Sequence, residues 1–239
     1  MDTLTTRVLS YADEGGHATD LVLTIFVPQS VDDAWKCGFS LPEPFRRKNA
    51  ESYGVDFIQA LLLCLQIVPS YLRLTPLLNR AHWQGMVHCG LPSRADLPAD
   101  YQPPDIGLAL ENPGNLEVLA TRSLGCPDPP GATRALTLTV YKPLQAGDLQ
   151  WSCAVSFGST DDKRLPVRYG AGADFIESFL DALALARATY ATMVPKGWHA
   201  SKSERLLDCD DFPFKIGRAF HTNMVGDLGP GAPEFFTPS

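Results

Sequence analysis

The sequence predicts an α+β protein made of two tandem β-β-β-α-(β) repeats that are related by a pseudo-twofold axis within one chain. Three observations predict this fold. Short sequences recur in the same order, each copy shows the alternating pattern of strands, and each copy continues into an apolar helix that begins at an aspartate. We expect a mostly antiparallel sheet, joined across the two repeats, with both helices packed on one face.

The internal duplication defines the domain organisation. The matched segments are residues 6–9 with 121–124, 21–28 with 136–143, 35–37 with 151–153 and 54–58 with 172–176, at an offset of about 115 to 121 residues. We therefore expect a first repeat over residues 1–92, a proline-rich connector over 93–117 and a second repeat over 118–225. The glycine and proline content of residues 226–239 predicts an irregular tail.

Strands are predicted where apolar residues alternate with polar ones. In the first repeat these are residues 4–11, 21–27 and 35–41, and in the second repeat 116–124, 136–143 and 151–157. Asp32-Asp33 marks the turn of a hairpin in the first repeat. Because side chains two residues apart share one face of a strand, Trp35 and Cys37 are expected to pack in the core together.

Each repeat also contains a helix with a clear start signal. Asp56 precedes the first helix and Gln59 follows three residues later, as Glu177 follows Asp174 in the second repeat, which is the pattern of a helix cap. The first helix has only a narrow polar stripe and is expected to be covered on most sides. The second is expected to be amphipathic, with Glu177 and Asp181 on its polar face. A fourth strand is predicted after each helix, at residues 86–91 and 206–209.

The Trp-x-Cys strand, followed by Gly-x-Asp-x-x-Gln-Ala-Leu at a helix start, resembles an uncharacterised bacterial domain family of unknown function. The residues that carry this resemblance are Trp35, Cys37, Gly54, Asp56, Gln59, Ala60 and Leu61. The second copy keeps Trp151, Cys153, Gly172 and Asp174, but has Glu177-Ser178-Phe179 where the family has Gln-Ala-Leu. The resemblance implies a bacterial origin. It implies no activity and no catalytic residue.

Composition narrows the classes of function. The chain has 239 residues, of which 45% are hydrophobic, so intrinsic disorder is excluded. The 27 acidic and 20 basic residues give a formal charge of -7, which disfavours nucleic acid as a partner. The longest apolar stretch is shorter than the roughly 20 residues of a membrane span. No secretory signal is recognisable, so we expect a cytoplasmic protein with reduced cysteines.

No catalytic, cofactor or metal site is predicted. The common phosphate-binding, dinucleotide-binding and nucleophile motifs are missing from the sequence. Asp56 and Asp174 are interpreted as helix caps rather than as an acid–base pair. The remaining candidates for ligands or a nucleophile are His82, His88, Cys89 and His199, and the sequence leaves open whether they converge. They support an alternative reading, an enzyme or small-molecule binder with a pocket between the repeats.

The acidic balance favours a protein partner. We expect a non-enzymatic bacterial binding protein, most concretely an immunity or antitoxin-like protein that occludes a basic toxin. It should be a monomer that contains an internal pseudo-dimer. The predicted partner-contact residues are Phe26, Tyr141, Asp32, Asp33, Asp210 and Asp211. A second alternative is a subunit or scaffold of a larger assembly, which would use the outer face of the sheet around Phe26 and Tyr141.

Overall fold

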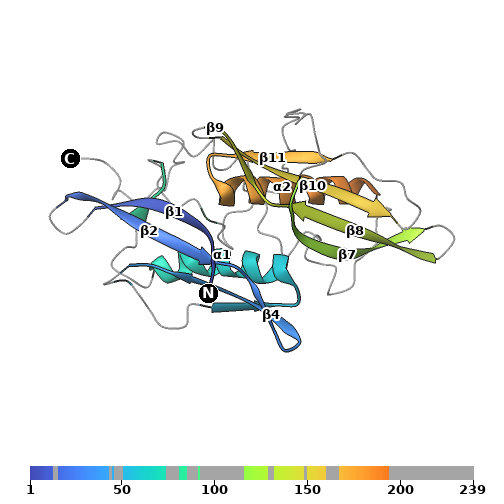
Figure 1. The fold of residues 1–239 in the computed structure, drawn as a ribbon, viewed down its shortest axis with the longest axis horizontal. Helices are drawn as coiled ribbons and strands as arrows, with labels where there is room; N and C mark the ends of the chain where they lie inside the picture. Colours follow the sequence, from blue (N-terminus) through green and yellow to red (C-terminus); the bar gives the residue numbers. More distant parts are fainter. Residues whose placement is uncertain are drawn as a thin grey trace, which may run out of the picture.

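The computed structural model describes residues 1–12, 16–42, 45, 51–73, 81–84, 91, 116–128, 132–147, 150–159 and 167–193. Over these residues the chain forms two antiparallel sheets and two helices, α1 (Phe57–Arg73) and α2 (Phe175–Met193) (Figure 1). The predicted α+β class is therefore confirmed. No helix in this part of the chain has both the length and the apolar character needed to cross a membrane.

The first sheet contains six strands, and three of them are the strands predicted for this part of the sequence. Their order is β3-β4-β2-β1-β6, and β5 also pairs with β4. The bounds are β1 Thr3–Ala12, β2 Ala18–Phe26, β3 Gln29–Val31, β4 Ala34–Ser40, β5 Glu51–Gly54 and β6 Ala81–His82. The turn at Asp32 joins β3 to β4, and Asp32 adopts a φ of 52°, a left-handed conformation that aspartate tolerates.

The second sheet contains five strands in the order β11-β10-β8-β7, with β9 also paired to β10. The bounds are β7 Val118–Asp128, β8 Ala132–Tyr141, β9 Leu144–Gly147, β10 Gln150–Ser159 and β11 Arg168–Gly172. The sequence did not predict β5 or β11, because each is short and contains glycine, which is rare in strands. β6 was not predicted, and the predicted strands at residues 86–91 and 206–209 fall on residues that, apart from residue 91, lie outside the described part of the chain.

The two helices begin as the sequence predicts. Asp56 Oδ1 accepts the Gln59 N–H at 2.8 Å, and the Gln59 side chain accepts the Val55 N–H at 2.6 Å. At the start of α2, Asp174 Oδ1 accepts the Glu177 N–H at 2.8 Å. These bonds satisfy backbone N–H groups that the first turn of a helix leaves without partners.

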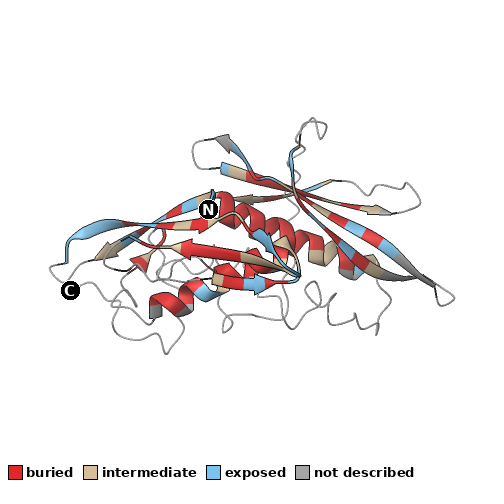
Figure 2. Cartoon of the chain, turned by 60° about the horizontal axis from the view of Figure 1, so that its bottom comes forward, coloured by how far each residue is buried: buried red, intermediate tan, exposed pale blue. Residues whose placement is uncertain are grey.

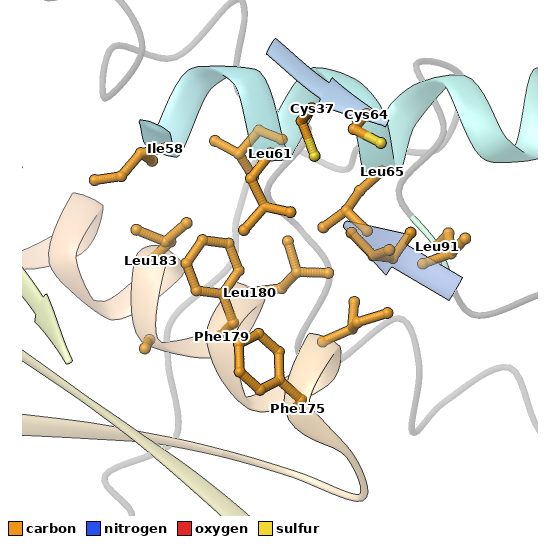
Figure 3. Close-up of a cluster of buried hydrophobic side chains, with 14 of the residues drawn as sticks. Cys37, Ile58, Leu61, Cys64, Leu65, Leu91, Phe175, Phe179, Leu180 and Leu183 are labelled. Atoms are coloured by element: carbon orange, nitrogen blue, oxygen red, sulfur yellow. The ribbon is translucent and has the colours of Figure 1, made fainter. Parts of the chain in front are cut away.

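The helices lie between the sheets, and this differs from the expected joined sheet. α1 packs on β4 and β5, whereas α2 packs on β10 and β11, so each helix covers one face of its own sheet. The two helices then face each other, with Ile58 and Leu61 of α1 across from Phe179 and Leu183 of α2 (Figure 3). The expectation of a joined sheet is wrong for the described residues, because the helices bury their second apolar faces against each other.

α1 is covered on most sides, as expected, but α2 is more deeply buried than its amphipathic pattern predicted. α2 is buried at every position from Phe175 to Ala186, whereas α1 leaves Ile67 exposed and Gln59, Leu63 and Gln66 half-buried (Figure 2). The amphipathic pattern of α2 is misleading because Glu177 and Asp181 bind backbone N–H groups instead of water. Buried carboxylates need such partners, so these two residues face the protein.

The close contact between α2 and β11 depends on Gly170, which has no side chain. A Cβ added at Gly170 would overlap the backbone of Ala182 in α2, and its nearest neighbours there are backbone atoms that cannot move away independently. Gly158, in β10, has no heavy atom within 4 Å of the same position. The close approach of helix and strand therefore explains glycine at position 170.

Substituting Gly170→Ala is expected to lower the free energy of unfolding by about 2–3 kcal/mol, because the helix must move away from β11. Gly158→Ala is the matched control and should change it by less than about 0.5 kcal/mol. Urea denaturation of both variants measures the difference. Equal unfolding midpoints for the two variants would show that the contact is not as close as described.

Candidate functional site

A buried ion pair connects β1 to the start of α2. Arg7 Nε and Nη2 donate to the two carboxylate oxygens of Asp174 at 2.6 and 2.7 Å. The Arg7 side chain is 0% exposed, and its guanidinium carbon lies 3.8 Å from the ring centroid of Trp83. A planar guanidinium suits both contacts, because it can form two parallel hydrogen bonds and stack on an aromatic face.

A second ion pair connects β7 to the start of α1. Arg122 Nε lies 3.4 Å from Asp56 Oδ2, and the arginine side chain is 5% exposed. Each of the two predicted helix caps therefore also pairs with an arginine from the other half of the chain. The aspartates are used for structure, as the cap interpretation proposed.

Arg7, Arg122 and Trp83 have no role that the sequence predicted. A signal was present, because Arg7 is in phase with the buried Leu9, and Arg122 is in phase with the buried Leu124. An arginine on the apolar side of an alternating strand must find a partner inside the protein. The identity of that partner is not encoded locally, because it lies 167 residues away in the case of Arg7.

The described cysteines lie in the core, as predicted for the Trp-x-Cys strands. Cys37, Cys64 and Cys153 are free thiols and all three are buried. A hydrogen bond with Cys37 and burial raise the pKa of the Cys64 thiol far above its usual range. Burial and the nearby Asp181 carboxylate do the same for the pKa of Cys153. Because the thiolate is the nucleophile, these thiols are poor candidates for catalysis.

The cluster of candidate ligands cannot be assembled from the described residues. His82 lies on β6, half-buried, beside Ser10 of β1. His88, Cys89 and His199 fall outside the described residues. In the ranges that the structure describes, His, Cys, Asp and Glu side chains form no group of three or more that could hold a metal ion.

The predicted partner-contact residues divide into three groups. Asp32 and Asp33 are exposed at the tip of the β3–β4 hairpin. Phe26 and Tyr141 are half-buried, and the Tyr141 hydroxyl lies 3.3 Å from Ser156 Oγ. Residues 210 and 211 lie outside the described residues. Asp32 and Asp33 form no hydrogen bond or ion pair within the described part of the chain, so their charges face solvent.

The hairpin tip lies beside the end of β5. Trp35, just after the tip, is opposite Gly54 in the antiparallel pairing of β4 with β5. Val55 follows Gly54 and is 62% exposed, and Tyr53 is 57% exposed. The acidic tip and these two apolar side chains define one surface, which we call the β5 surface: Asp32, Asp33, Tyr53 and Val55. The β5 surface therefore combines two carboxylates that have no ion-pair partner among the described residues with two exposed apolar side chains.

A second exposed apolar site lies on the outer face of the first sheet. Val8 of β1 and Val22 of β2 are directly opposite each other and are 50% and 41% exposed. The flanking pairs on the same face are Thr6 with Thr24 and Ser10 with Asp20, so one exposed carboxylate lies beside the two valines. The outer sheet face therefore offers exposed apolar groups next to a single acidic residue.

Comparison with known proteins bears on the first half of the chain. Residues 5–92 match the model of a domain family described as a domain of unknown function, DUF6968. This agrees with the resemblance to an uncharacterised family. The matched range contains α1, its Asp56 cap and the first sheet. Searches of the curated proteins and of the solved structures found no match.

The Arg7–Asp174 pair is expected to give a strongly non-additive double-mutant cycle. Asp174→Asn keeps a capping side chain but leaves the buried guanidinium without its counter-charge, so it should cost about 3–5 kcal/mol of stability. Adding Arg7→Met removes the buried charge and should recover part of that loss. Chemical denaturation of the two single variants and the double variant tests this, and simple additivity would contradict a direct pair.

The buried thiols should make the protein less stable at alkaline pH. Their folded-state pKa values are raised above the ordinary thiol value of 9.0, so the stabilising effect is complete below pH 9 and is lost as the pH rises further. Each thiol should contribute a slope of about 1.4 kcal/mol per pH unit above pH 9. Cys153→Ala should reduce the slope of the unfolding free energy. An unchanged slope would show that the Cys153 thiol titrates normally in the folded state.

Proposed function

We propose that this chain is a non-enzymatic binding protein that holds a basic protein partner through the β5 surface. In its most concrete form, it is an immunity or antitoxin-like protein of the bacterial cytoplasm that occludes a basic toxin. The observation that carries the proposal is the position of Asp32 and Asp33, which are exposed, without a partner in the described residues, and next to exposed apolar side chains. Such a combination attracts and then holds an oppositely charged protein.

The state of the interior carboxylates and thiols supports a binding role. Asp56 and Asp174 each cap a helix and each face an arginine, so their oxygens are already bound. Burial keeps Cys64 and Cys153 protonated. These four side chains are therefore engaged in holding the fold.

We also infer that the two halves arose by duplication and are related by a pseudo-twofold axis. The reciprocal ion pairs support this, because Arg7 and Arg122 occupy matched positions in the sequence, as do Asp56 and Asp174. The strand orders agree as well when β1, β2, β4 and β5 are set against β7, β8, β10 and β11. Such an arrangement within one chain is equivalent to an isologous dimer interface.

Local contacts support the same inference. Trp35 packs edge-on against Phe57 with ring centroids 5.8 Å apart, and Trp151 packs in the same way against Phe175 at 6.2 Å. Cys37 Sγ lies 3.5 Å from a carbonyl oxygen at the end of β2, and Cys153 Sγ lies 3.3 Å from the corresponding oxygen of β8. Repeated contacts of this kind follow from repeated sequence.

Affinity capture with charge-matched variants tests the proposed function. The full chain is immobilised and exposed to extract of its own organism at low salt. Asp32→Asn with Asp33→Asn removes two charges while keeping residues that suit the turn, and should weaken retention of a basic protein about tenfold. Asp2→Asn with Asp20→Asn removes two charges elsewhere and should have little effect.

The proposed function fails if no basic protein is retained, or if both double variants retain it equally. Retention should also fall at about 0.5 M salt, because exposed charges are screened over only a few ångströms there.

A further inference from the structure

The free edge of the second sheet is closed by its own helix. β11 pairs only with β10, so one side of β11 has no neighbouring strand in the described part of the chain. On that side, Ala173 N–H donates to Glu177 Oε2 at 2.6 Å and Ala171 N–H donates to Asp181 Oδ2 at 3.0 Å. Glu177 and Asp181 are four residues apart on α2, so they lie on the same face of the helix. Two buried carboxylates therefore accept from two of the N–H groups on this edge.

The first sheet lacks the second of these acceptors. Val55 N–H donates to the Gln59 side chain at 2.6 Å, as Ala173 does to Glu177. Alternate N–H groups of a strand point to the same side, so the N–H of Tyr53 points to the same open edge as that of Val55. The position that matches Asp181 is Leu63, whose side chain has no acceptor. None of the described side chains accepts a hydrogen bond from the Tyr53 N–H.

An open edge of this kind is a template for another strand. β5 is short, with four residues, and β4 is its one partner among the strands that the structure describes. The side chains of Tyr53 and Val55 next to the open edge are more than half exposed. Other sheet proteins bind extended peptides by adding a strand to such an edge, where backbone bonds give affinity and neighbouring pockets or charges give specificity.

Charge identifies the kind of strand that fits. Glu51, at the start of β5, is paired with Lys36 at 3.2 Å. Asp32 and Asp33, at the other end of β5, have no such neutralising partner among the described residues. A segment added to this edge would therefore meet a net negative field at the hairpin tip. A second copy of this chain is a poor fit, because both molecules carry a formal charge of -7.

We propose that the open edge of β5 binds an extended segment of a partner protein, paired to the Tyr53 backbone and carrying lysine or arginine beside the hairpin tip. This inference rests on the proposed function and specifies how the β5 surface engages its partner. Residue 63 of α1 determines whether this edge is available. A hydrogen-bond acceptor at position 63 would bind the Tyr53 N–H, as Asp181 binds the Ala171 N–H on the other sheet, whereas leucine leaves the Tyr53 N–H for a partner strand.

Amide hydrogen exchange of the full chain provides the first test. The Tyr53 amide should exchange about 100-fold faster than the Ala171 amide, because one is open and the other is hydrogen-bonded. Leu63→Asp recreates the closed arrangement and should slow exchange at Tyr53 about tenfold or more. Leu63→Ala is the matched control, since it alters packing without adding an acceptor, and should leave Tyr53 exchange fast. A Tyr53 amide that is already as protected as Ala171 would overturn the proposal.

A synthetic probe provides the second test. The probe is a seven-residue peptide of alternating threonine and valine with two lysines at one end, compared with the same peptide carrying glutamates. At millimolar concentration the basic peptide should protect the Tyr53 amide in the unsubstituted chain and in Leu63→Ala, but not in Leu63→Asp. Tyr53→Pro removes the N–H itself and serves as a second closed variant if Leu63→Asp does not fold. Because this variant has no amide at position 53, peptide binding to it is measured by titration calorimetry beside the unsubstituted chain, and binding of the basic peptide should be lost.

Three results would overturn the proposal. These are no protection by the basic peptide, equal protection by both peptides, and dimers in light scattering with Tyr53 protected, which would make a second copy the occupant. The outcome is separable from that of the proposed function. If Leu63→Asp retains the captured basic protein as well as the unsubstituted chain does, the binding function stands and strand addition at β5 is wrong.

Discussion

The buried contact between Arg7 and Asp174 determines how the two halves of this protein fit together. A guanidinium that is removed from water needs a counter-charge with matching geometry, and the carboxylate at the first turn of α2 supplies one through two hydrogen bonds. The same carboxylate accepts the Glu177 N–H, so the helix begins where the arginine is neutralised. β1 and α2 are thereby fixed relative to each other. The longer Arg122–Asp56 contact joins β7 to α1 in the same sense.

This constraint explains why the buried carboxylates of the described residues are already bound by other groups of the fold. Asp56 and Asp174 use their oxygens for helix N–H groups and arginines, while Glu177 and Asp181 use theirs for the edge of β11. The thiols are held inside the core between helix and sheet. Asp32 and Asp33, at the tip of the β3–β4 hairpin, are exposed and form no ion pair within the described part of the chain. The proposed binding role rests on these two charges.

Features encoded locally in the sequence were predictable. Alternation located the long strands, and the Asp56–Gln59 and Asp174–Glu177 spacings located both helix starts. β5 and β11 were missed because a four- or five-residue strand with glycine has little signal of its own. The burial of α2 was missed because hydrophobic periodicity assigns every carboxylate to the solvent-exposed face of a helix. Glu177 and Asp181 face inward because N–H groups at the edge of β11 lie there, and this contact depends on the tertiary structure.

The candidate site was predictable only in part. The acidic pair at positions 32 and 33 could be read as a turn and as exposed charge. Its position beside Tyr53 and Val55 could not, since it depends on the antiparallel pairing of β4 with the unpredicted β5. Likewise, Arg7 and Arg122 were visible as charges on an apolar face, but their partners lie in the opposite half of the chain.

The exchange of charged partners between halves has a consequence for folding. If only the first half were ordered, the Arg7 guanidinium would lack the Asp174 carboxylate, and α1 would lack a neighbour for Ile58 and Leu61. A half-folded chain would therefore lose contacts that stabilise each half in the native state. The protein should cross its transition as one cooperative unit, although its sequence reads as two.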